Sequence, residues 1–168
     1  MLRPPSASEI TELDELWHDY MIGLLAHCPK LGADRDPKEP FRRSWRGEDL
    51  VIDVEGVPVG FIVIAGTTDD AFVKWPVGSL EVRDVYIAPS HRNMSLAPRA
   101  VREAMSRHKP PAWCFFVYAG NRDSTTAISR YFHRLGYAPT LLKSAWAGCP
   151  GTYLRLDPPQ NSVTSSTP

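Results

Sequence analysis

The residues best suited to chemistry lie at one junction, 85–97, where a predicted strand runs through a loop into a predicted helix. Such a junction gathers backbone N–H groups and the positive end of a helix dipole around one point. Asn93 can adopt a positive φ at less cost than most residues, and Ser95 and Ala97 are small enough for close approach to the backbone. Arg92 adds a positive charge at the rim. The pattern therefore indicates a phosphate-binding loop.

The strand before this loop carries two carboxylates, Glu81 and Asp84. Either one could accept a proton from a reacting group, or simply be a solvent-facing polar residue of a strand. Strict alternation along the strand predicts two faces, one with Glu81, Arg83, Val85 and Ile87 and the other with Val82, Asp84 and Tyr86. The two carboxylates are thus expected on opposite faces.

Metal and disulfide chemistry are not indicated by the spacing of the candidate ligands. The five histidines show no metal-ligand spacing. The three cysteines, Cys28, Cys114 and Cys149, stand far apart, are odd in number and form no CxxC pair. We therefore expect neither a structural zinc site nor a disulfide framework.

Length and charge restrict the class of protein. A chain of 168 residues can bury one substantial core without needing disulfides or a bound metal to stabilise it. The 19 Lys and Arg residues balance the 19 Asp and Glu residues, which argues against a dedicated nucleic-acid binder. No stretch approaches the roughly 20 apolar residues that span a bilayer, so we expect no membrane partner and a cytoplasmic location.

Hydrophobic periodicity predicts an α/β domain with a mixed sheet. Helices are expected at 9–27, 97–107 and 126–135, and strands at 50–54, 57–65, 79–87, 113–119, 137–142 and 151–156. A polar stretch rich in Pro and Gly, 29–48, is expected to be a loop. One domain, 1–156, is followed by a Pro-, Ser- and Thr-rich segment, 157–168, which is expected to be a disordered tail.

The loop resembles a signature of the GNAT superfamily of N-acetyltransferases. In that family a valine or isoleucine, any residue and a proline precede, by two residues, the pattern (Gln/Arg)-x-x-Gly-x-(Gly/Ala). This chain reads Ile87-Ala88-Pro89 and then Arg92-Asn93-Met94-Ser95-Leu96-Ala97, with Ser95 where the family usually has Gly. A second match, in order and with fitting spacing, consists of Asn121, Ala127, Tyr131 and Leu135-Gly136-Tyr137. The resemblance covers about residues 2–156.

The resemblance implies a fold and an activity. The fold would be a mixed, mostly antiparallel twisted sheet with helices on both faces. The activity would be transfer of an acetyl group from acetyl-CoA to a primary amine of a small molecule or a protein, by direct attack in a ternary complex and without a metal. The alternative is a non-catalytic module that binds acyl-CoA and regulates a partner.

The resemblance also implies a role for each matching residue. The pyrophosphate would be bound by the loop Arg92, Asn93, Met94, Ser95, Leu96 and Ala97, and the pantetheine arm by the main chain at Val85 and Ile87. Asn121 would contact the cofactor or substrate, and Tyr131 would protonate the departing thiolate. Glu81, acting directly or through a water, is our first choice as general base, with Asp84 as the second.

The long loop leaves two questions open. Its basic cluster, Arg42, Arg43 and Arg46, would favour an acceptor with a carboxylate or phosphate if it borders the acceptor pocket, or is otherwise a solvated loop face. Several aromatic residues fall in or near predicted loops. These residues are Trp17, Phe41, Trp45, Trp75 and Trp146. They could line the acceptor site, form a homodimer contact or anchor loops to the core.

Overall fold

The computed structural model describes residues 1–32, 40–46, 48–69, 73–118, 122–146 and 149–158. Its strands form one seven-stranded sheet in the order β1-β2-β3-β4-β5-β7-β6. Their bounds are β1 Leu2–Arg3, β2 Leu50–Val54, β3 Val57–Gly66, β4 Leu80–Ile87, β5 Trp113–Tyr118, β6 Ala138–Trp146 and β7 Cys149–Asp157. Among the described strand pairs only β4 and β5 are parallel, so the sheet is mixed and mostly antiparallel, as predicted.

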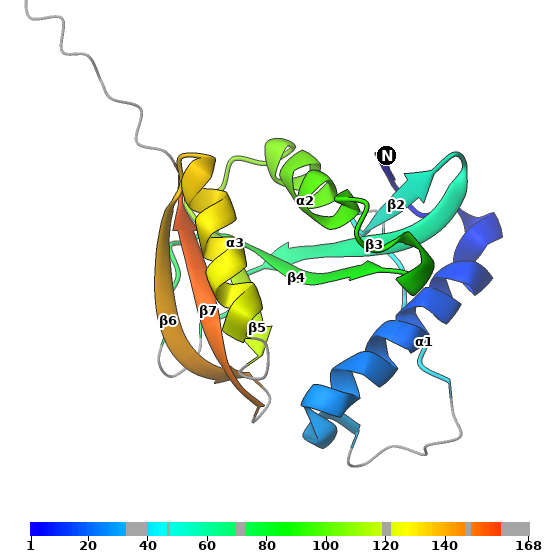
Figure 1. Ribbon diagram of the computed structural model, residues 1–168, viewed down its shortest axis with the longest axis horizontal. Coiled ribbons are helices and arrows are strands. Elements are labelled where there is room, and N and C mark those ends of the chain that lie inside the picture. Colours follow the sequence, from blue (N-terminus) through cyan, green and yellow to red (C-terminus); the bar gives the residue numbers. More distant parts are fainter. Residues whose placement is uncertain (33–39, 47, 70–72, 119–121, 147–148, 159–168) are drawn as a thin grey trace, which may run out of the picture.

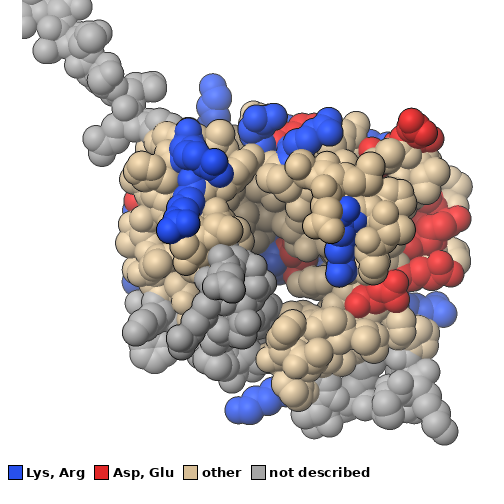
Figure 2. All heavy atoms as spheres, in the orientation of Figure 1, with Lys and Arg blue, Asp and Glu red and all other residues tan. Residues whose placement is uncertain are grey.

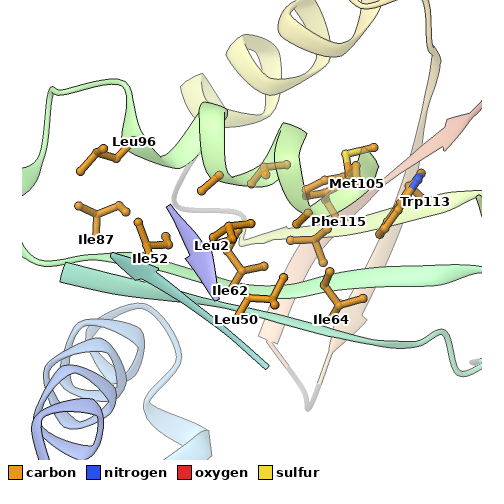
Figure 3. Close-up of a cluster of buried hydrophobic side chains, with 14 of the residues drawn as sticks. Leu2, Leu50, Ile52, Ile62, Ile64, Ile87, Leu96, Met105, Trp113 and Phe115 are labelled. Carbon is orange, nitrogen blue, oxygen red and sulfur yellow. The ribbon is translucent and has the colours of Figure 1, made fainter. Parts of the chain in front are cut away.

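Helices cover both faces of the sheet (Figure 1). Helix α1, Ile10–His27, lies on one face, whereas α2, Leu96–Ser106, and α3, Arg122–Arg134, lie on the other. The α2 and α3 face holds the larger core, in which Leu96 of α2 lies above Ile87 of β4 and Met105 of α2 lies above Phe115 of β5 (Figure 3). Burying this apolar surface is the main force that holds the helices on the sheet.

The face under α1 is packed by aromatic rings. Phe61 and Tyr86 are buried there, and Trp17 and Tyr20 of α1 pack against them. The Phe61 and Tyr86 rings stack with centroids 5.7 Å apart. Trp45, from the segment before β2, joins the same cluster, so this loop aromatic anchors its loop to the core.

The predicted elements are present, with differences at their ends. Helix α3 begins at Arg122, four residues before the predicted start, and β6 extends to Trp146. Strand β1 was not predicted, because two residues are too short to show a period. Strand β7 ends at Asp157, and residues 159–168 of the predicted tail lie outside the described residues.

The cysteine spacing, which predicted no disulfide framework, did not predict the disulfide at Cys28. Cys28, which follows the last residue of α1, is disulfide-bonded, whereas Cys114 in β5 is free and buried. An odd number of widely spaced cysteines does not reveal which of them meet in space, because chain topology decides that.

Strand β4 contains a β-bulge at Arg83. Val63 of β3 pairs with Asp84 and the next residue, Ile64, pairs with Val82, so Arg83 has no partner in β3. An extra residue in one strand shifts the alternation of all residues beyond it. The two-face pattern predicted from strict alternation is therefore wrong. Val82 joins Val85 and Ile87 in the core under α2, rather than lying opposite to them.

Candidate active site

Strands β4 and β5 separate after a short contact. Their parallel pairing covers three positions, from Leu80 opposite Trp113 to Val82 opposite Phe115. Beyond Val82 the two strands diverge in Figure 1, and the structure describes no further pairing between them. Val85 and Ile87 lie on this diverging part of β4. An unpaired strand edge exposes N–H and C=O groups that can bind an extended ligand.

The predicted phosphate-binding loop forms a cavity of about 740 Å³ beside this edge. Asn93 adopts a φ of 65°, as predicted, and Ser95 adopts a φ of 55°. Ser95 thus takes the left-handed conformation for which glycine is normally used, and it directly precedes α2. Although Ser95 stands where the family usually has Gly, the loop backbone keeps the conformation that a glycine would adopt.

The six loop residues do not all face this cavity. Its walls include Arg92, Asn93, Ser95 and Ala97, and Leu96 contributes to the wall while its side chain is buried in the core. Met94 is not part of the wall, and its side chain is 54% exposed. The binding capacity of the loop therefore depends on its backbone and on Arg92 more than on its apolar side chains.

The Arg92 side chain is hydrogen-bonded to the end of β4. Its Nε donates to the main-chain oxygen of Ile87 at 3.1 Å, and its guanidinium lies 5.8 Å from the centre of the Tyr86 ring. These contacts hold a fixed positive charge in the wall of the cavity. A pyrophosphate would thus meet both backbone N–H groups and a cation whose position is set.

A second, largely apolar slot of about 410 Å³ continues from the loop cavity. The two share Val85, Ala97 and Pro98 in their walls. The slot then passes between α2 and α3, where Phe115 and Tyr131 line it. A ligand with a phosphate end and a long, mostly apolar arm matches this sequence of surfaces.

Tyr131 spans the slot from α3 to α2. Its hydroxyl donates to the main-chain oxygen of Pro98 at 3.0 Å, and its ring lies edge-on to Phe132 at 5.2 Å. The structure thus places this predicted residue in the slot with a defined hydrogen-bond partner. Asn121, the other predicted residue of this segment, lies outside the described residues.

Glu81 and Asp84 lie on the same face of β4, contrary to the prediction. Val82 packs in the core under α2, so its neighbour Glu81 faces the α1 side, and Asp84 contacts Tyr20 of α1. The bulge at Arg83 causes this, since it inserts one residue between the two carboxylates. Two acidic groups are therefore brought to one side of the sheet.

Burial raises the pKa of both carboxyl groups above their ordinary values. Glu81 is only 8% exposed, and Arg83 Nε lies 3.3 Å from its Oε2, which partly offsets the effect of burial on its pKa. For Asp84, the hydrogen bond from Tyr20 and the charges of Arg43 and Arg83 oppose the rise in pKa. A carboxyl with a raised pKa can act as a proton acceptor near neutral pH.

Within the basic cluster of the long loop, the Arg43 side chain is bound to the protein itself, whereas Arg42 and Arg46 are exposed. Arg43 donates to Asp49 at 2.9 Å, and its guanidinium lies over the rings of Trp17 and Trp45 at 5.0 and 5.7 Å. Asp49 is buried and also accepts from the Arg46 main-chain N–H at 2.8 Å. Arg43 therefore anchors the loop to α1.

Tyr20 and Asp49 were not predicted as site residues, and Arg43 was predicted only as a member of the basic cluster Arg42, Arg43 and Arg46. Tyr20 is separated from Asp84 by 64 positions in the chain. In the sequence, Tyr20 shows only the helical spacing of a core aromatic. Nothing in a single sequence pairs it with a strand residue so far along the chain.

Charge is divided between the two sides of the site, although the net charge is zero. Helix α1 carries Glu12, Asp14, Glu15 and Asp19 and no Lys or Arg. Figure 2 shows this face hollowed between α1 and the two other helices, with acidic side chains gathered over α1 and basic ones over α2 and α3. An anionic ligand is therefore favoured on the α2 and α3 side.

Among the described residues, no helix is long and apolar enough to cross a membrane. No cluster of His, Cys, Asp and Glu able to hold a metal ion is found in that part of the chain.

Solved structures with the same fold are known. A diaminobutyrate acetyltransferase from Paenibacillus lautus, solved with L-2,4-diaminobutyric acid and coenzyme A, is 18% identical with a TM-score of 0.63, and the match covers 97% of each chain. A GNAT acetyltransferase from Streptococcus agalactiae is 16% identical with a TM-score of 0.64, covering 94% of this chain and 95% of that one. An N-acetyltransferase from Staphylococcus aureus is 10% identical with a TM-score of 0.60, covering 92% and 99%.

No curated protein matches the chain in sequence. The model of the acetyltransferase (GNAT) family, by contrast, matches residues 11–137. The matched range runs from α1 to the end of α3 and so contains the diverging strands, the loop and the slot. The chain therefore belongs to the GNAT family of acetyltransferases, whose members use acyl-CoA.

Proposed function

We propose that this protein transfers an acetyl group from acetyl-CoA to a primary amine of a small molecule or a protein. The observation that carries the proposal is the continuity of the loop cavity with the apolar slot, which share Val85, Ala97 and Pro98. A cavity with backbone N–H groups and Arg92 suits the pyrophosphate. The slot between α2 and α3 suits the pantetheine arm.

In this arrangement, the main chain at Val85 and Ile87 pairs with the amides of the pantetheine arm as an added strand would. The diverging edge of β4 supports this role, since it is not paired to β5 beyond Val82 in the described residues. The thioester is thereby aligned along β4, on the strand that also carries Glu81 and Asp84. Aligning two reactants is itself a large part of such a reaction's rate enhancement.

The reaction proceeds by direct attack in a ternary complex. The acceptor ammonium first gives one proton to Glu81, directly or through a water, and the free amine nitrogen then bonds to the thioester carbonyl carbon. The C–S bond breaks, the thiolate takes a proton from the Tyr131 hydroxyl, and the second proton of the nitrogen passes through water to the Tyr131 oxygen, which restores the phenol and leaves a neutral amide. That hydroxyl donates to Pro98 in the present structure, so it must turn from this carbonyl toward the sulfur.

Calorimetric titration of the purified protein with acetyl-CoA, coenzyme A and ATP tests the binding half of the proposal. Both coenzyme A species are expected to bind, and ATP is not. The matched variants are Ala97→Glu, which puts a negative charge in the wall shared by the two cavities, and Ala26→Glu, on the exposed side of α1. Only Ala97→Glu is expected to lose binding.

A screen of primary amines that follows thiol release tests the transfer half. Release that depends on both acetyl-CoA and amine supports acetyl transfer. Tight binding of acetyl-CoA without transfer to any small amine or peptide would favour the non-catalytic acyl-CoA-binding module. Binding to neither coenzyme A species would refute both.

A further inference from the structure

A tyrosine of α1 makes a short hydrogen bond to the strand that carries the two carboxylates. The Tyr20 hydroxyl donates to Asp84 Oδ1 at 2.5 Å. This length is typical of a hydroxyl that donates to an ionised carboxylate, and such charge-assisted bonds are stronger than neutral ones. Neither cavity of the proposed cofactor site includes Tyr20 in its wall.

Packing fixes the direction of this hydroxyl. Among the described residues, the Tyr20 ring contacts Trp17 at 5.3 Å, Phe61 at 5.6 Å with an interplanar angle of 90°, and Tyr86 at 5.9 Å. Phe61 is fully buried. The ring therefore has little freedom to turn, and the hydroxyl is held at Asp84 by the core rather than by the hydrogen bond alone.

The charges around Asp84 come from several elements. Arg43, from the segment before β2, and Arg83, from β4 itself, favour the ionised carboxylate, whereas Asp49 opposes it. Glu81 on the same face is coupled to Asp84, whose charge raises the pKa of Glu81. Burial of Asp84 favours its neutral form, and the Tyr20 hydrogen bond works against that tendency.

We propose that Tyr20 is a positioning residue for acetyl transfer, which holds Asp84 as a fixed carboxylate that receives the acceptor ammonium. Glu81, on the same face, is then the group that removes the proton. One Asp84 oxygen accepts from Tyr20, and in the proposed role the other would accept from the acceptor ammonium. This role rests on the proposed function, because it needs an ammonium-bearing acceptor.

The test compares wild type with Tyr20→Phe, which removes the hydroxyl and keeps the ring. Carbon-13 NMR of labelled aspartate, with Asp84→Asn used to assign the signal, measures the titration of the Asp84 carboxyl. The Asp84 midpoint is expected to move to higher pH. The KM for the amine at neutral pH is expected to rise about tenfold, with a smaller change in kcat and no change in acetyl-CoA affinity.

Two further variants separate positioning from packing. Leu16→Ala removes packing from the same aromatic cluster without touching the hydroxyl, so it should lower stability and leave the Asp84 titration in place. Asp84→Asn alone should raise the amine KM, and the double variant Tyr20→Phe with Asp84→Asn should raise it no further.

An Asp84 titration that is the same in Tyr20→Phe as in wild type would overturn the proposal. A shifted titration with an unchanged amine KM would also overturn it, since Tyr20 would then act on Asp84 without a role in transfer. If the titration moves but wild type acetylates no amine, the proposed function itself is wrong, and the role in transfer is lost with it.

Discussion

The Tyr131 hydroxyl donates to the main-chain oxygen of Pro98 over 3.0 Å, which joins α3 to the first turn of α2 across the apolar slot. The carbonyl of Pro98 belongs to a helix whose proline lies in the slot wall. The same hydroxyl is our candidate acid for the thiolate. The bond joins the two helices in the free protein, and it would have to break for the proposed role of this hydroxyl as proton donor.

Tyr131→Phe is expected to lower kcat by about 100-fold, because the thiolate then leaves without a proton donor. Acetyl-CoA affinity should stay within about twofold, because the ring still lines the slot. Steady-state kinetics and calorimetry measure the two quantities. Tyr137→Phe is the matched control, since Tyr137 packs against Phe132 and is not part of the slot wall. Unchanged turnover in Tyr131→Phe would remove this hydroxyl from the mechanism.

Glu81→Gln is expected to lose activity most at low pH and to recover as the pH rises. At high pH the acceptor amine is already deprotonated in solution, so a general base is no longer needed. The pH profile of kcat/KM measures this, with Glu12→Gln on the exposed side of α1 as the control. A Glu81→Gln profile parallel to that of wild type would contradict a role as base.

The raised pKa of Glu81 also leads to a prediction about the stability of the fold. Burial raises its pKa in the folded state above the ordinary value of 4.5, so the folded protein binds more protons than the unfolded chain across that window. The contribution of Glu81 to stability is complete below pH 4.5 and decreases as the pH rises through the raised pKa. Urea unfolding should therefore show that Glu81→Gln gains stability relative to wild type from pH 4 to pH 8. A constant difference would mean that the Glu81 carboxyl is not perturbed by folding.

Ser95→Gly is expected to stabilise the protein by about 1 kcal/mol, because the left-handed backbone conformation of this residue is strained with a Cβ and unstrained in glycine. The φ of Ser95 is 55°. Acetyl-CoA should bind at least as tightly as to wild type. Ser90→Gly is the control, because Ser90 lies in a 3-10 turn without a positive φ. A loss of acetyl-CoA affinity in Ser95→Gly would show instead that the hydroxyl contacts the ligand.

Gly60→Ala is expected to destabilise the protein by about 3 kcal/mol. A Cβ at Gly60 would lie 2.1 Å from the main-chain oxygen of Tyr86, so β3 and β4 would have to separate beside the loop. Gly23→Ala offers a matched control in α1, where a Cβ meets no atom within 4 Å. That change should stabilise the helix by about 1 kcal/mol. Equilibrium unfolding in urea measures both, and equal effects of the two changes would contradict the close approach of the strands at Gly60.

The sequence alone determined most of the local structure. Helical spacing of apolar residues predicted α1 and α2, β-branched runs predicted the hairpin of β2 and β3, and the loop residues predicted the positive φ of Asn93. These features depend on neighbours within a few positions, so their signal is present in a short window of sequence. The family followed from the same local motifs.

Tertiary structure decided how the candidate groups meet. The bulge at Arg83 brought Glu81 and Asp84 to one face, although alternation placed them on two. Pairing with β3 creates that bulge, and a bulge leaves no periodic trace in the strand itself. The hydrogen bond between Tyr20 and Asp84 and the divergence of β4 from β5 likewise join parts of the chain that are far apart in sequence. Packing of whole elements sets such contacts, which is why the sequence supplied the groups and only the fold arranged them.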